Sequence, residues 1–63
     1  MRYRIESFGG LKAVTYTSWI DATLVAEKFA VESLMPATIT DDDGRRWNKY
    51  PGQPPVLAEG PSK

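Results

Sequence analysis

The chain has 63 residues, a formal net charge of zero, and neither cysteine nor histidine. A chain of this length forms one small domain, which buries only about 60% of its unfolded surface. Without cysteine no disulfide can stabilise such a core, and without cysteine and histidine the usual ligand sets for zinc, haem and iron–sulfur clusters are missing. Nucleophile arrangements that depend on histidine are missing for the same reason. We therefore expect a globular protein that is not an enzyme and binds no cofactor or metal.

The charge pattern and the N-terminal sequence limit partners and location. Eight basic residues balance eight acidic ones, which is not the composition of a broadly basic nucleic-acid-binding protein. No segment approaches the roughly 18 apolar residues of a membrane span. Charged residues begin at Arg2 and no apolar run follows, so the start does not resemble a secretory signal. We expect a cytoplasmic protein that has no contact with a membrane.

The first part of the chain predicts a β-hairpin. Residues 2–8 alternate charged and apolar side chains, as a half-buried strand does. Gly9 and Gly10 supply a turn that tolerates positive φ. Residues 11–17 are rich in β-branched and aromatic types and predict the return strand.

An amphipathic helix is expected next. Residues 19–35 contain neither glycine nor proline, and Pro36 ends the segment. Ser18 is the candidate N-cap, and Asp21 places a negative charge in the first turn, where the helix dipole favours it. One face collects small and aromatic side chains, namely Trp19, Ala22, Ala26, Phe29, Ala30 and Ser33.

A second hairpin and a tail complete the chain. Residues 37–40 predict a short strand and residues 45–50 a fourth one, joined by a turn at Asp43–Gly44. Residues 51–63 hold four prolines and two glycines and show no periodicity, so we expect a disordered, flexible C-terminal tail. Residues 1–50 are then a single domain.

The expected fold class is α+β, a two-layer β-β-α-β-β arrangement with one helix packed on a small, mostly antiparallel sheet. A right-handed crossover through the helix places the third strand beside the first, in the spatial order 2-1-3-4. A core this thin leaves room for stabilisation by dimerisation or by a partner. Besides the helix face, the predicted core residues are Tyr3, Ile5, Val14, Tyr16, Ile39 and Trp47.

The run Asp41–Asp43 is the first candidate for a metal site. With Gly44 at the sixth position of an EF-hand loop, Ile39 and Tyr50 stand where the first and last ligands are required, so the pattern fails. We interpret the run as a hairpin turn whose carboxylates accept bonds from nearby backbone amides. Alternatively, these acids address a basic nucleic-acid channel.

The charged residues of the helix suggest no site. Glu27, Lys28 and Glu32 predict a solvated face with modest pairing between successive turns.

The sheet face opposite the helix carries the first candidate binding surface. Alternation places Arg2, Arg4 and Arg46 on this face, with Tyr50 expected nearby. Arginine forks beside an aromatic ring suit phosphate or carboxylate recognition and base stacking. The alternative is an ordinary solvated sheet face that Glu6 and cross-strand threonines neutralise.

The helix carries the second candidate surface. Ile20, Leu24 and Val31 form a row outside the core-facing side of the helix. An exposed aliphatic row of this kind suits a partner groove or a dimer contact. The alternative is a broad core face that the sheet edge or the Val56–Leu57 segment covers.

The arrangement of elements resembles small phage-encoded inhibitor proteins. The strand Tyr3–Ser7, the strand ending at Tyr16–Thr17, the helix Asp21–Ala30 and the strand Ala37–Thr40 are similar in order to a coliphage inhibitor of host RNA polymerase. The hairpin Asp43–Trp47 resembles the ending of some compact anti-CRISPR proteins. The resemblance covers residues 2–50 and rests on the order and patterning of elements. It implies a non-catalytic protein that acts by occupying a surface on host nucleic-acid machinery.

The sequence-based hypothesis is a phage-type inhibitor that sterically blocks a bacterial nucleic-acid-handling complex, best matched by an anti-CRISPR protein in the bacterial host cytoplasm. The alternatives are an inhibitor of host RNA polymerase, a small nucleic-acid-binding module, and a homodimeric structural protein. The expected partner is a bacterial protein or ribonucleoprotein, with direct nucleic-acid binding less favoured, and the chain is a monomer or a homodimer. The candidate partner-binding residues are Arg2, Arg4, Arg46 and Tyr50 on the sheet, and Ile20, Leu24 and Val31 on the helix.

Overall fold

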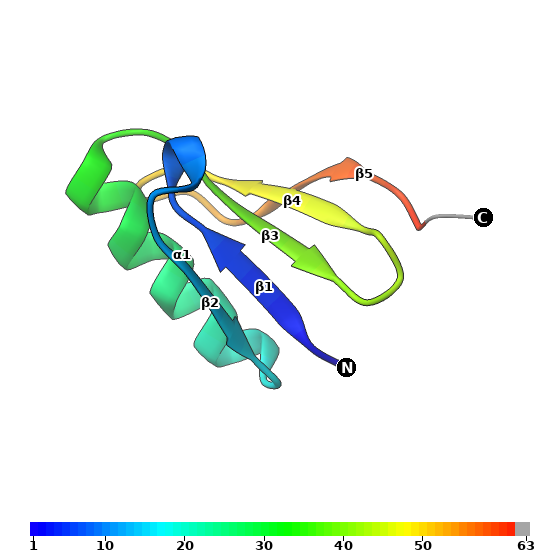
Figure 1. The fold of residues 1–63 in the computed structure, drawn as a ribbon. Helices are drawn as coiled ribbons and strands as arrows, with labels where there is room; N and C mark the ends of the chain where they lie inside the picture. The colour runs from blue at the N-terminus through cyan, green and yellow to red at the C-terminus, as the bar shows by residue number, and fades with distance from the viewer. Residues whose placement is uncertain (62–63) are drawn as a thin grey trace.

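In the described part of the chain, five strands form one antiparallel sheet, and a single helix lies against one of its faces (Figure 1). The computed structural model describes residues 1–61. The elements in chain order are β1 (Tyr3–Glu6), the 3-10 turn η1 (Phe8–Gly10), β2 (Ala13–Tyr16), α1 (Trp19–Ser33), β3 (Ala37–Asp41), β4 (Arg46–Lys49) and β5 (Val56–Glu59).

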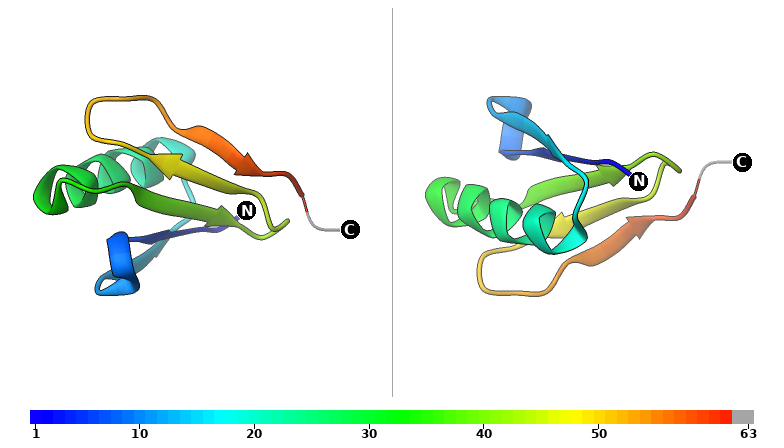
Figure 2. Two further views of the ribbon diagram at one scale, coloured as in Figure 1. Left: turned by 90° about the horizontal axis from the view of Figure 1, so that it is seen from above. Right: turned by 90° about the horizontal axis from the view of Figure 1, so that it is seen from below.

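The strand order confirms the predicted topology and extends it by one strand. The order is β2-β1-β3-β4-β5, so β3 lies beside β1, as the right-handed crossover requires. α1 packs mainly on β1 and β3 and less on β2 and β4, while β5 extends the sheet beyond that strip (Figure 2). The fold is therefore the expected two-layer α+β class with a wider sheet.

The prediction of a disordered tail is wrong for β5. Leu57 lies opposite Trp47 of β4 and Val56 lies opposite Asn48, with a register shift at the start of β4. All four residues of β5 are exposed, so the strand shows none of the burial alternation by which a sequence pattern reveals a strand. Three of the four prolines precede β5 and Pro61 follows it, so none interrupts the strand, and an edge strand tolerates prolines at its ends. Residues 62–63 of the predicted tail lie outside the described part of the chain.

The connection between the first two strands differs from the expected tight hairpin. β1 and β2 are shorter than predicted, and residues 7–12 join them through the turn η1. Gly9 and Gly10 both have positive φ, 79° and 73°, so the prediction that this turn needs glycine is confirmed.

The helix begins as expected and ends earlier. The Ser18 hydroxyl accepts a hydrogen bond from the Asp21 amide at 3.4 Å, which confirms the N-cap. α1 ends at Ser33 rather than at residue 35, because Leu34 turns the chain into the left-handed conformation at φ 57°, ψ 25°. Met35 then donates its amide hydrogen to the Ser33 hydroxyl at 3.3 Å.

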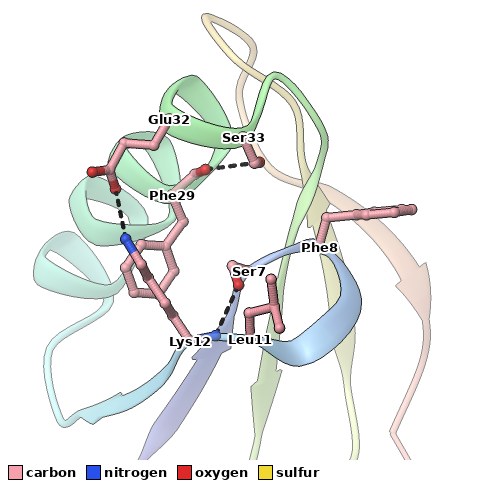
Figure 3. Close-up of a pocket in the computed structure, with 7 residues that line it drawn as sticks. All are labelled: Ser7, Phe8, Leu11, Lys12, Phe29, Glu32 and Ser33. Atoms are coloured by element: carbon pink, nitrogen blue, oxygen red, sulfur yellow. Dashed lines mark hydrogen bonds and ion pairs between the residues drawn. The ribbon is translucent and has the colours of Figure 1, made fainter.

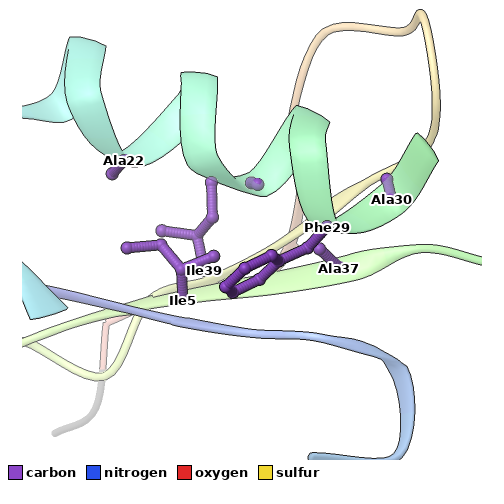
Figure 4. Packing of buried hydrophobic residues seen from close by; sticks show 7 residues of the cluster. Ile5, Ala22, Phe29, Ala30, Ala37 and Ile39 are labelled. Atoms are coloured by element: carbon purple, nitrogen blue, oxygen red, sulfur yellow. The ribbon is translucent and has the colours of Figure 1, made fainter. Parts of the chain in front are cut away.

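The core lies between α1 and the middle of the sheet (Figure 4). Ile5 of β1 and Ile39 of β3 are fully buried and face each other in the β1–β3 register. Small side chains on the helix let it approach the sheet closely, and Phe29 is the one large helix side chain in the buried cluster. The buried cluster is Ile5, Ala22, Ala26, Phe29, Ala30, Ala37 and Ile39.

Most of the predicted core is confirmed, with two exceptions. Tyr3, Val14 and Trp47 are partly buried and pack against the cluster. Tyr16 is exposed because it ends β2, which is an edge strand. Ser33 is exposed at the last turn of α1, where its hydroxyl donates to the Phe29 carbonyl oxygen at 2.9 Å.

Leu34 gives a test of backbone strain at the helix end. A residue with a side chain is less stable than glycine in the left-handed region, by about 1–2 kcal/mol. The Leu34 side chain is 80% exposed and recovers little by packing. We expect Leu34→Gly to raise the free energy of unfolding by about 1 kcal/mol in urea titrations. Leu34→Ala, which keeps the Cβ atom, is the control, and an equal gain in both variants would contradict the explanation.

Candidate functional site

Within residues 1–61 no helix covers the face of the sheet opposite α1, and the side chains of this face form two rows across all five strands. Thr15, Arg4, Thr40, Arg46 and Glu59 succeed one another as register partners from β2 to β5. We call this surface the open face. The second row consists of Ala13, Glu6, Thr38, Asn48 and Val56.

One end of the open face is hollowed. A concavity of about 330 Å³ is lined by two arginines, two threonines and two aspartates: Arg2, Arg4, Thr15, Thr40, Asp41 and Asp42. Guanidinium and hydroxyl groups supply hydrogen-bond donors, which suit a carboxylate or phosphate group. We call this hollow the arginine concavity.

The charges around the arginine concavity are partly compensated. Arg4 Nε lies 3.3 Å from Glu6 Oε1, and Arg46 Nη1 lies 3.2 Å from Glu59 Oε1. Both pairs are exposed, and such pairs contribute roughly 0–1 kcal/mol, so a better acceptor can displace them. Among residues 1–61 the Arg2 guanidinium forms no ion pair, while the Arg2 backbone amide donates to Asp42 Oδ2 at 2.9 Å. Arg2 is therefore the arginine most available to a ligand.

The structure brings together only part of the predicted sheet site. Arg2 and Arg4 both line the concavity. Arg46 lies one strand further, because Thr40 stands between it and Arg4 in the register, which places the two arginines about 10 Å apart at the backbone. Tyr50 is not near them: it follows the far end of β4, about 13 Å along the strand from Arg46.

Thr15 is the lining residue that sequence reasoning missed. It lies directly opposite Arg4 in the first hairpin. The pairing register would have identified it, but the glycine turn alone does not fix that register.

The acidic turn is used within the molecule, as the hairpin interpretation predicted. Asp41 Oδ1 accepts hydrogen bonds from the amides of Asp43 and Arg45, both at 2.9 Å, and Asp41 Oδ2 accepts one from Arg45 Nη1 at 3.2 Å. The Asp41 side chain is fully buried by these contacts. The carboxylate that shapes the turn is thus unavailable to a basic partner.

The helix row is exposed, as the first of the two interpretations expects. Ile20, Leu24 and Val31 are 70%, 63% and 50% exposed. The alternative in which Val56–Leu57 covers this row is wrong, because both residues belong to the exposed edge strand β5.

A second cavity, of about 150 Å³, lies between η1 and the last turns of α1 (Figure 3). Lys12 spans its mouth: its ammonium lies 3.7 Å from Glu32 and 5.9 Å from the centre of the Phe29 ring. The Ser7 hydroxyl accepts a hydrogen bond from the Lys12 amide, and the Ser33 hydroxyl donates a hydrogen bond to the Phe29 carbonyl oxygen. The polar groups around this cavity are engaged with one another, so we regard it as part of the packing between η1 and α1.

Glu27 and Lys49 form a polar contact that the sequence analysis did not predict. Lys49 is buried under α1, and its ammonium donates hydrogen bonds to Glu27 Oε1 and to the Tyr50 carbonyl oxygen. The Gly52 amide donates to the same carboxylate, at 2.9 Å to Oε1. The hydrogen bond from Lys49 holds the pKa of Glu27 below its ordinary value, and that from Gly52 acts in the same direction. Glu27 therefore joins the helix to the turn before β5 and is not part of a solvated charge row.

No helix within residues 1–61 combines the length and the apolar character that crossing a bilayer requires. Within the same residues, no three acidic side chains gather as metal ligands.

Comparison with protein-family models, curated proteins and solved structures finds no match for this chain.

Glu27 predicts how stability depends on pH. Because its pKa is lower in the folded chain than the ordinary value of 4.5, the carboxylate stabilises the fold fully above that value. This contribution is lost as pH falls through the folded-state pKa. We expect urea titrations to show the stability advantage of the wild type over Glu27→Gln shrinking below about pH 4.5 and staying constant above about pH 5.5.

Glu32→Gln is the matched control for this experiment, because within residues 1–61 the Glu32 carboxylate pairs only with exposed Lys12. Its stability difference from the wild type should change little over the same pH range. A pH-independent difference for Glu27→Gln would contradict the role assigned to the Lys49–Glu27 pair.

Proposed function

We propose that this chain is a non-catalytic inhibitor that binds a bacterial nucleic-acid-handling complex and blocks it sterically, with an anti-CRISPR protein in the host cytoplasm as the specific form. The observation that carries the proposal is the arginine concavity on an otherwise uncovered sheet face. A rigid sheet presents such a surface without rearrangement, and preorganisation of this kind favours affinity.

The chemistry of the concavity supports an acidic patch on a protein as the bound group. Arg2 and Arg4 lie beside the threonine hydroxyls, and together they can bind a carboxylate through several donors. The chain as a whole has zero net charge, so it lacks the broad positive field that steers binding to nucleic acid. Direct binding to nucleic acid is for that reason the less favoured form of the proposal.

The first experiment is a plaquing assay. The chain is expressed in bacteria whose CRISPR system targets an infecting phage, with one strain for each available system type. We expect it to restore plaquing to the level of a strain that carries no targeting spacer. A matched transcription assay with purified host RNA polymerase tests the alternative target. If plaquing and transcription both stay unchanged, the inhibitor proposal is wrong for these targets.

The second experiment tests the surface. Arg2→Glu/Arg4→Glu should weaken binding to the complex identified above by about 100-fold, because each arginine contributes a charge-assisted contact of about 1.5 kcal/mol. Lys12→Glu is the control: it reverses a charge beside Phe29, on the helix side of the sheet. Equal affinity of the double variant and the control, measured by calorimetry, would exclude the concavity as the binding surface.

Binding to bare oligonucleotide, measured over a range of salt concentrations, tests the remaining alternative. If the chain binds bare oligonucleotide with an affinity that falls steeply with salt, it acts as a nucleic-acid-binding module instead.

A further inference from the structure

The outer face of α1 carries a spacing that the inhibitor proposal does not use. Ile20, Leu24, Glu27 and Val31 follow one another at intervals of four, three and four residues. This is the spacing of the seam in a pair of packed helices. We call these four residues the α1 seam. Ile20, Leu24 and Val31 are exposed, and within residues 1–61 no other helix or strand lies over this side of α1 (Figure 2). The turn before β5 reaches the seam at Glu27.

Glu27 does not place a free charge in the middle of the α1 seam. Its carboxylate is turned towards Lys49 and the Gly52 amide, at the side of the helix. The methylene groups of the side chain can therefore contact an apolar neighbour, as those of long charged side chains do.

Two charged residues flank the seam on one side. Asp21 follows Ile20 directly and Lys28 follows Glu27 directly, so the two charges stand seven residues apart on the same flank. Both are exposed, and within residues 1–61 neither forms an ion pair. Seven residues correspond to about 10 Å along a helix, which is too far for these two charges to pair with each other.

We propose that α1 pairs in antiparallel orientation with α1 of a second copy of this chain. One register brings the residues of the α1 seam into contact and also pairs the flanking charges. Ile20 then meets Val31 of the second copy, and Leu24 meets the stem of the second copy's Glu27. The flanking residues of antiparallel helices meet residues of the same flank. Asp21 of each copy therefore lies opposite Lys28 of the other, so the unpaired charges become two equivalent ion pairs.

The two-fold symmetry of this charge pattern favours a second copy over an unrelated groove. A closed dimer uses the same patch on both chains, and each chain here carries both members of the ion pair. One 15-residue helix per chain makes a small interface, so the dimer belongs to the weak, concentration-dependent class. The pairing leaves both open faces pointing outward. It does not depend on the proposed inhibitor function, because it uses the other side of the molecule.

Charge reversal tests the register. We expect sedimentation at low salt, at chain concentrations up to about 1 mM, to show a reversible dimer for the wild type. Asp21→Lys alone and Lys28→Asp alone should each weaken it by at least about 10-fold, because both ion pairs become like-charge contacts. An equimolar mixture of the two variants should restore association, since every Lys then faces an Asp.

The mixture controls for folding, because the same two variants associate only with each other. A wild type that stays monomeric at the highest concentration would overturn the proposal. Single variants that dimerise like the wild type, or a mixture that stays monomeric, would also overturn it. Leu24→Glu places a charge inside the α1 seam. A dimer that survives this change uses another surface, such as the edge of β5, and excludes the proposed pairing.

Discussion

The buried ammonium of Lys49 determines how the second half of the sheet is attached to the helix. A lysine under a helix needs hydrogen-bond partners, because burying an unpaired charge is strongly unfavourable. Glu27 supplies a carboxylate from α1 and the Tyr50 carbonyl supplies the second acceptor. The same carboxylate holds the amide of Gly52, so one side chain fixes the helix, the end of β4 and the turn that leads to β5.

The sequence predicts the parts of this fold that have clear periodicity. The core was predictable, because the alternation in residues 2–8 and the helical spacing of small residues both match the observed burial. The helix N-cap was predictable from Ser18, and the strand order from the right-handed crossover. The Lys49–Glu27 contact was not: alternation with Trp47 puts Lys49 on the core side of β4, but it does not identify the partner that a buried lysine requires. β5 was missed for a related reason: an exposed edge strand is stabilised by pairing with the neighbouring strand, and its own sequence shows no hydrophobic alternation.

The candidate site was predictable only in part, since it depends on register. Alternation identified Arg2, Arg4 and Arg46 as residues of one face, but only the pairing shows that Thr40 separates Arg4 from Arg46. The expected position of Tyr50 was wrong because β4 ends at Lys49, at the opposite end from Arg46. The open face is also neutralised within itself by Glu6 and Glu59. A partner must therefore replace these weak ion pairs by stronger contacts to the same arginines. Shape and charge complementarity at short range then matter more for binding than long-range electrostatic attraction.

The position of β5 outside the strip covered by α1 has a consequence for dynamics. β5 pairs with one strand only within residues 1–61, and its other attachments are the exposed Arg46–Glu59 pair and the preceding turn. It therefore opens more easily than the strands under the helix. Its backbone amides should exchange with solvent through local opening, while those of β1 and β3 exchange only when the whole domain unfolds. Each opening exposes the edge of β4, including Trp47, to strands of other molecules. The last four-residue strand thus acts as a cover that keeps an aggregation-prone edge closed for most of the time.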